Sequence, residues 1–241
     1  MSEEQVQAYT AHVRELLKLG YSHVNSEDKE PALGHFDRAL ELMSSLDDAR
    51  LEAEVQTARG IALLYQRNNA AALAAFDVSL ERARASGVEY LEADAWHNVG
   101  LALQRIGRHA DALPALERAV VLFERQDVPS ALPMTWHTMA RCHAALGQRN
   151  EALAAYDRTV DTAVRLENDR ELARAAVSRA LLQRRMSQRA DAETSLELAI
   201  AANTRLGATR STRRLRLRLV LWRLQRGRVG GALVALISRG G

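Results

Sequence analysis

The sequence predicts an all-α protein built from stacked pairs of antiparallel helices, and three observations favour this class. Aromatic residues make up only 5% of the 241 residues, and long stretches rich in Ala, Leu, Arg and Glu favour helix over strand. Apolar residues fall three and four positions apart, which is the period of an α-helix. One alanine recurs every 40 residues, as Ala32, Ala72, Ala112, Ala152, Ala192 and Ala232.

Each 40-residue unit is expected to contain two helices that cross closely. Four residues after the recurring alanine the side chain is large, at Phe36, Phe76, Leu116, Tyr156, Leu196 and Leu236. Twelve residues before it the residue is small in all units but the last, at Gly20, Gly60, Gly100, Ala140, Ala180 and Val220. Small residues on both helices let the two backbones approach, and the large side chain then fills the space beside the crossing.

Turn-forming residues recur at the same period and mark the ends of the expected helices. The two helices of a unit are separated at Gly107-Arg108, Gly147-Gln148, Ser187-Gln188 and Gly227-Arg228. Successive units are separated at Asp47-Asp48, Ser86-Gly87, Asp127-Val128-Pro129, Glu167-Asn168-Asp169 and Leu206-Gly207. We therefore expect an N-terminal helical extension (1–12), five repeats (13–212) and a basic partial sixth repeat or C-terminal cap (213–241).

The order of residues within a unit resembles the tetratricopeptide repeat. It is carried by Trp96, Val99-Gly100, Leu103, Ala112, Leu116 and Ala119, and again by Trp136, Met139-Ala140, His143, Ala152, Tyr156 and Thr159. The period of 40 departs from the usual 34, and similar longer units occur in bacterial regulators and in eukaryotic polarity scaffolds. The resemblance implies a right-handed superhelix, an α-solenoid, whose concave surface is lined by the first helix of each unit.

Charge is divided unevenly along the chain. The net charge is +3, but no Asp or Glu follows Glu197 and ten Arg do, so the end of the chain carries about +10 and the rest about −7. Residues 211–228 alternate Arg with Leu, yet the repeat register assigns them to the first helix of the sixth unit. There Leu215, Leu219, Val220 and Trp222 can cover the fifth unit.

The resemblance places a set of His, Asn and Arg side chains on the concave surface. A strip of guanidinium groups suits an extended, carboxylate-rich peptide, because Arg pairs with carboxylates through two hydrogen bonds. The alternative is that these arginines only solvate an alanine-rich surface. The candidate partner-binding residues are His97, Asn98, Arg105, His137, Arg141, Arg174, Arg184, Arg185, Arg214 and Arg218.

No catalytic or metal-binding pattern is expected. His97 and His137 lie one repeat apart beside Trp96 and Trp136, but two histidines without a nearby carboxylate or thiolate make a poor metal site. Cys142, the only cysteine, has no recognisable base. The sequence lacks a phosphate loop or a His-Glu-x-x-His motif, so we expect no enzyme, no cofactor and no metal.

The leading hypothesis is a non-catalytic scaffold or adaptor that binds an acidic peptide segment of another protein. The first alternative is a regulatory sensor that binds a signalling peptide or small molecule near His97 and His137. The second is attachment to an anionic surface, or self-association, through the Arg-rich end, where residues 232–237 are apolar. Nucleic acid is a weaker option, because Trp222 is the only aromatic residue among these arginines. The acidic N-terminus and the single cysteine favour a soluble, cytoplasmic protein.

Overall fold

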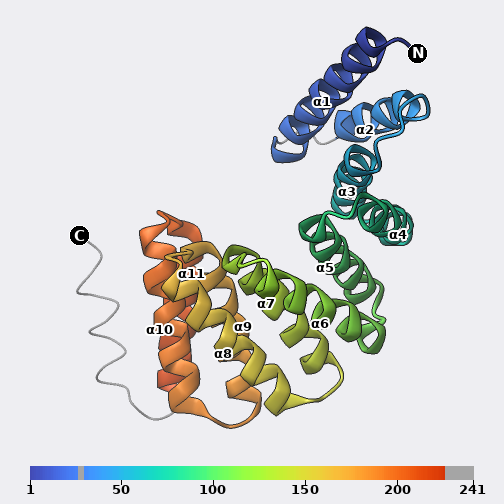
Figure 1. The fold of residues 1–241 in the computed structure, drawn as a ribbon. Coiled ribbons are helices and arrows are strands. Elements are labelled where there is room, and N and C mark those ends of the chain that lie inside the picture. Colours follow the sequence, from blue (N-terminus) through green and yellow to red (C-terminus); the bar gives the residue numbers. More distant parts are fainter. Residues whose placement is uncertain (27–29, 226–241) are drawn as a thin grey trace. The chain divides into compact units, whose positions relative to one another are not determined.

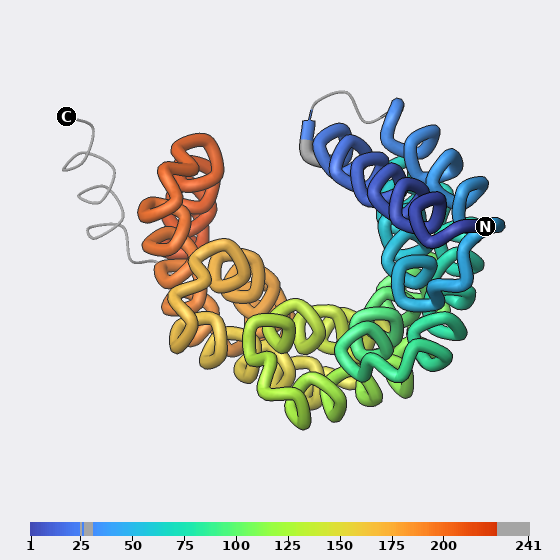
Figure 2. Tube along the Cα trace, turned by 45° about the horizontal axis from the view of Figure 1, so that its top comes forward, coloured from blue at the N-terminus to red at the C-terminus, as the bar shows by residue number. Residues whose placement is uncertain are grey.

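The computed structural model describes residues 1–26 and 30–225, which form α-helices, one short 3-10 helix and no strand (Figure 1). The predicted all-α class is confirmed. The chain divides into two compact units, one of Met1–Val128 and one that begins at Pro129. Figure 2 traces the successive helices of each unit.

The first unit contains three helix pairs. The first helices of these pairs are α1 (Glu3–Asn25), α3 (Ala49–Tyr65) and α5 (Glu89–Ile106), and the second helices are α2 (Glu30–Met43), α4 (Asn69–Ser86) and α6 (His109–Arg125). Helix α1 is continuous, so the expected boundary at residue 12 falls inside it. Side-chain caps start α1, α3 and α4: Ser2 accepts from the Gln5 amide, Asp48 from the Leu51 amide and Asn68 from the Ala71 amide.

The second unit opens with the 3-10 turn Pro129–Ala131 and continues with two helix pairs and one further helix. These are α7 (Leu132–Ala145), α8 (Arg149–Arg165), α9 (Asp169–Arg185), α10 (Arg189–Arg205) and α11 (Thr209–Leu224). The alternating Arg and Leu residues lie on α11, as the repeat register predicts. Leu215, Leu219 and Trp222 are buried there against Ala180 and Leu196. The rest of the predicted sixth unit, 226–241, lies outside the described residues.

The close crossing predicted from the small residues is present in the first three pairs. A Cβ built on Gly20 would lie 2.3 Å from Cε1 of Phe36, and one on Gly60 would lie 2.4 Å from Cε1 of Phe76. A Cβ built on Gly100 would lie 2.5 Å from Cγ of Leu116. Since real Cβ atoms do not approach carbon atoms this closely, glycine lets the two helices of each pair meet at van der Waals distance.

A second regularity lies in the turns, where one residue with positive φ recurs every 20 positions from 67 to 207. Four of these residues are glycines, at 87, 107, 147 and 207. The other four are Arg67, Asp127, Glu167 and Ser187, with φ between 52° and 65°. A left-handed residue after the last helical turn lets the following amide bond back to the helix carbonyls, so each helix stops at the same place.

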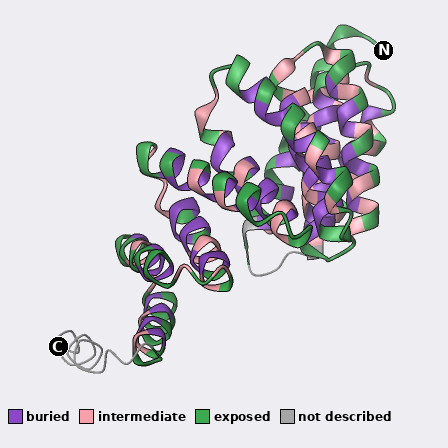
Figure 3. Cartoon of the chain, turned by 90° about the horizontal axis from the view of Figure 1, so that it is seen from below, coloured by how far each residue is buried: buried purple, intermediate pink, exposed green. Residues whose placement is uncertain are grey.

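Burial follows the contacts between neighbouring helices. Buried residues, purple in Figure 3, face the adjacent helices of each unit, and exposed residues, green, face away from them. The recurring alanines at 32, 72, 112, 152 and 192 are all fully buried. These alanines lie on the second helix of each pair, and their small side chains let the neighbouring helices approach closely.

Candidate functional site

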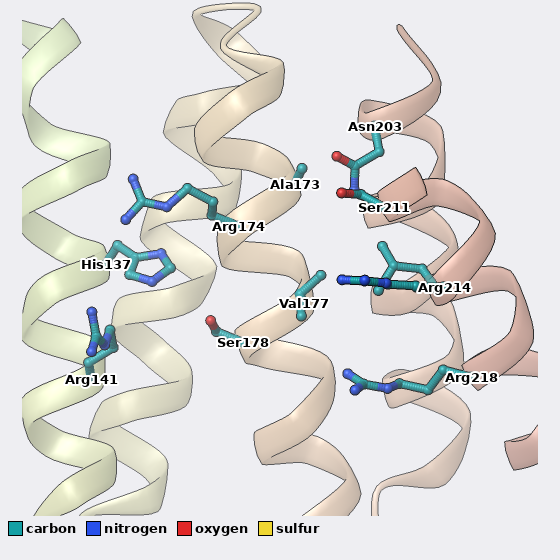
Figure 4. Close-up of a pocket in the computed structure, with 11 residues that line it drawn as sticks. His137, Arg141, Ala173, Arg174, Val177, Ser178, Asn203, Ser211, Arg214 and Arg218 are labelled. Atoms are coloured by element: carbon teal, nitrogen blue, oxygen red, sulfur yellow. The ribbon is translucent and has the colours of Figure 1, made fainter. Parts of the chain in front are cut away.

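The second unit contains a cavity of about 550 Å³ whose lining is rich in arginine. Side chains from three first helices, α7, α9 and α11, converge on it, together with Asn203 near the end of α10 (Figure 4). We call this cavity the arginine pocket. It is lined by His137, Arg141, Ala173, Arg174, Val177, Ser178, Asn203, Ser211, Arg214, Leu215 and Arg218.

The helical period explains why these side chains meet. On each of the three helices the main polar pair is four residues apart and so shares one face: His137 with Arg141, Arg174 with Ser178, and Arg214 with Arg218. Arg174 and Arg214 are also equivalent across one 40-residue repeat. The pocket therefore arises from one helix face that repeats as the pairs stack.

The charge of the pocket is largely uncompensated. Arg174 Nη1 lies 2.7 Å from Oε1 of Glu171, which is buried on the same helix. Within the part of the chain that the structure describes, no carboxylate pairs with Arg141, Arg214 or Arg218, and no acidic residue lines the cavity. Three guanidinium groups thus face a shared space with all their donors available for an anion.

His137 forms a buried wall of the pocket. Its side chain is only 6% exposed, its ring meets that of Tyr156 edge to face at 5.6 Å between centroids, and its Nδ1 is buried without a hydrogen-bond partner. Burial, with Arg174 and Arg141 nearby, lowers the pKa of His137 to about 4. The imidazole is therefore neutral at pH 7, and its Nδ1 lacks the partner that buried polar atoms usually have.

Two predicted arginines lie outside the lining of this pocket. The guanidinium of Arg184 stacks over the Trp222 ring at 5.0 Å from its centroid and donates to Oε1 of Gln225. These contacts hold α11 against α9. Arg185 is exposed, and it lies close enough to Tyr156 to act on the pKa of its hydroxyl.

The remaining predicted residues, His97, Asn98 and Arg105, lie in the first unit on α5. His97 is 2% exposed, and burial lowers its pKa to about 4. Asn98 is also buried and donates to the backbone oxygen of Asp94 at 2.9 Å and to its Oδ2 at 3.1 Å. Arg105 is exposed at the end of the helix. The histidines therefore belong to different units, and both are core residues.

The sequence reasoning missed Asn203 and Ser211, although a signal for Ser211 exists. Ser211 precedes Arg214 by three residues, so it lies one turn earlier on the same face of α11. Asn203 is on a second helix, and the assumption that first helices alone line the surface excluded it.

The only thiol of the sequence, which is its other potentially reactive group, is buried. Cys142 is fully buried as a free thiol, and burial raises its pKa to about 11, so it is protonated at pH 7. Among residues 1–26 and 30–225, no three His, Cys, Asp or Glu side chains gather as metal ligands would. None of the described helices combines the length and the apolar character needed to cross a membrane.

Comparison with known proteins places this arrangement in a known fold. The tetratricopeptide repeat family model matches residues 93–122, which carry most of α5 and most of α6. No curated protein matches the sequence.

Solved structures match over most of the chain. The apo form of RapI superposes with a TM-score of 0.73 at 18% identity, over 93% of this chain and 80% of RapI. A Rap protein complexed with Competence and Sporulation Factor gives 0.64 at 19% identity, over 93% of this chain and 66% of that one, just under two thirds. YrrB, a TPR protein with an unusual peptide-binding site, gives 0.52 at 22% identity, over 82% of this chain and 93% of YrrB. At these identities the likeness establishes the fold.

Proposed function

We propose that this chain, a tetratricopeptide-type repeat protein, is a non-catalytic binding module that holds an acidic, extended segment of another protein. The observation that carries the proposal is the arginine pocket, where Arg141, Arg214 and Arg218 line one cavity and no described carboxylate compensates them. Guanidinium groups pair with carboxylates through two parallel hydrogen bonds, and such pairs are strengthened where water is partly excluded.

The shape of the site supports an extended ligand. The charged lining residues come from α7, α9 and α11, the first helices of successive pairs, so a chain that crosses these helices meets a charged group on each of them. Ala173, Val177 and Leu215 add apolar surface between the charges. Two of the proteins with this fold are described as binding another molecule: one Rap protein is complexed with Competence and Sporulation Factor, and YrrB has an unusual peptide-binding site.

The state of the potentially reactive groups supports a non-catalytic role. Cys142 is buried and protonated, and His137 is flanked by Arg141 and Arg174 instead of by a carboxylate that would orient it as a base. The site has many hydrogen-bond donors and no described acid, which suits holding an anion better than transferring a proton. We place this function in the cytoplasm, where the free thiol of Cys142 stays reduced.

The experiment uses a fluorescein-labelled 12-residue peptide of alternating Glu and Ala and measures its affinity for the full chain by fluorescence polarisation. The double variant R214E/R218E should weaken binding by at least about tenfold, because each reversal replaces an attraction with a repulsion. The control R210E/R213E changes the net charge by the same amount at two exposed arginines of α11 outside the pocket. Equal losses in the two variants, or none in R214E/R218E, would refute the proposed site.

A second candidate is a regulatory sensor that takes up a small molecule or a signalling peptide. It is favoured by the buried Nδ1 of His137, which lacks a partner inside a cavity large enough for a compact ligand. A screen of anionic metabolites by thermal shift separates the two candidates. A sensor should be stabilised by one metabolite more strongly than by the Glu-containing peptide, whereas the binding module should be stabilised more by that peptide than by any free metabolite.

A further inference from the structure

We propose that the arginine pocket recognises a phosphoryl group, so that the segment bound by this protein is phosphorylated at the position that enters the cavity. This inference rests on the proposed function and names the chemistry of the anchoring group. It is carried by the number of uncompensated cations, by the buried His137 nitrogen and by the mixed lining of the cavity.

The charge balance favours a dianion over a single carboxylate. Of the four arginines in the pocket, only Arg174 has a described carboxylate partner, Glu171 at 2.7 Å. Arg141, Arg214 and Arg218 leave about three positive charges around one cavity. A carboxylate offers one negative charge and two oxygens, whereas a phosphate monoester offers a charge of roughly −1.5 to −2 and three terminal oxygens at pH 7. The phosphate monoester therefore offsets more of the repulsion between the arginines than a carboxylate does.

The donors come from different directions, which fits a tetrahedral group. In Figure 4 Arg214 and Arg218 reach into the cavity from α11, while Arg141 lies across from them on α7, with Ser178 on α9 between these helices. A planar carboxylate presents its lone pairs in one plane and is best met by one or two forks from the same side. Donors on three helices suit a group that presents its oxygens in three directions.

His137 supplies the second, independent indication of a ligand. Its side chain is only 6% exposed and lines the cavity, and its Nδ1 has no hydrogen-bond partner. Buried polar atoms usually have a hydrogen-bond partner, and a group bound in the cavity would supply one to this nitrogen. Its proximity to Arg141 and Arg174 fits a ring that donates one N–H to an oxyanion also held by guanidinium groups.

The apolar part of the lining suits the carrier of the phosphoryl group. Val177 and Leu215 lie beside the arginines and can contact the carbon atoms that link the phosphate to the chain. The cavity of about 550 Å³ exceeds what one phosphate ion needs. The site therefore fits a phosphorylated side chain better than free phosphate.

The test uses phenyl phosphate and benzoate, which share the same ring, as probes of the full chain in isothermal titration calorimetry. Phenyl phosphate should bind at least about tenfold more tightly than benzoate, because it brings about one more charge and a third oxygen. R214Q/R218Q should abolish this preference, and R210Q/R213Q should keep it. H137Q should weaken phenyl phosphate more than benzoate.

The pH dependence provides a readout that general anion binding would not give. The second ionisation of a phosphate monoester lies near pH 6, so affinity for phenyl phosphate should rise severalfold between about pH 5 and 7.5 while affinity for benzoate stays flat. Equal affinity for both probes, or a flat pH profile for phenyl phosphate, would overturn the inference. If the Glu-rich peptide still loses affinity in R214E/R218E in that case, the proposed function stands and only the phosphoryl assignment fails; if it does not, both fail.

Discussion

The ring of Phe76 on α4 occupies the space beside Gly60 on α3, where an added Cβ would lie 2.4 Å from Cε1 of the ring. Phe76 is fully buried, so its ring is enclosed by other protein atoms. The two residues together set the distance between the helices of this pair.

Gly60→Ala should therefore destabilise the protein, despite the higher helix propensity of alanine. Overpacking of this kind costs about 1–3 kcal/mol, measured as the free energy of unfolding in urea. The matched control is Gly34→Ala in α2, where an added Cβ meets nothing within 4 Å. That change should stabilise by roughly 0.5–1 kcal/mol.

The double change G60A/F76L should recover part of the loss, because it recreates the Ala180 and Leu196 pair of the fifth repeat, in which both residues are fully buried. No recovery would mean that the helix spacing in α3 and α4 is fixed by other contacts.

Glu167 holds a left-handed conformation, with φ of 53°, at a turn position that is glycine at 87 and 207. Glu167→Gly should raise the free energy of unfolding by about 0.5–1 kcal/mol, because a residue with a Cβ is disfavoured in this conformation. Glu167→Ala serves as the control, since it removes the carboxylate but keeps the Cβ. Equal effects of Gly and Ala would show that charge, and not backbone strain, governs this position.

Asp94 should make the protein less stable at neutral pH than at acid pH. Burial raises its pKa to about 6, although a hydrogen bond from Asn98 opposes the shift. A folded pKa above the unfolded value means that the contribution to stability is full below about pH 4 and is lost as pH rises through 6. Asp94→Asn should stabilise by on the order of 1–3 kcal/mol at pH 7.5 and change little at pH 3.5, as measured by urea unfolding.

His97 should make the protein less stable at acid pH than at neutral pH, the opposite of the effect of Asp94. Its folded pKa of about 4 lies below the ordinary value of 6.5, so its contribution is full above pH 6.5 and is lost as pH falls towards 4. His97→Gln should therefore flatten the decline of stability in this window, while Asp94→Asn should steepen it. A decline that H97Q leaves unchanged would contradict the assigned burial of this imidazole.

The repeat made the fold predictable to an unusual degree. The 40-residue period located the crossing glycines and the turns, because each feature recurs and errors at one position are corrected by the others. The left-handed residues at Arg67 and Glu167 could not be read from residue type, since neither favours positive φ. They become visible only when aligned by the period with Gly107 and Gly87.

The site was less predictable, because a repeat register gives a face and not the contacts on it. The register assigned Arg141, Arg174, Arg214 and Arg218 to one surface, and these four residues line one cavity. It could not foresee that Arg184 stacks on Trp222, because that contact depends on how α11 packs against α9. Nor did it indicate that His137 lines a cavity while His97 is enclosed in the first unit.

The central claim is that the arginine pocket binds an acidic segment. The most direct test reverses the charge of the pocket and, separately, the charge of the peptide. The affinities of the Glu-containing peptide and of its Lys-substituted counterpart are measured for the unmodified chain and for R214E/R218E, with R210E/R213E as control. We predict that the unmodified chain and the control prefer the Glu peptide, whereas R214E/R218E prefers the Lys peptide. An unchanged preference in R214E/R218E would contradict the assignment of this pocket as the binding site.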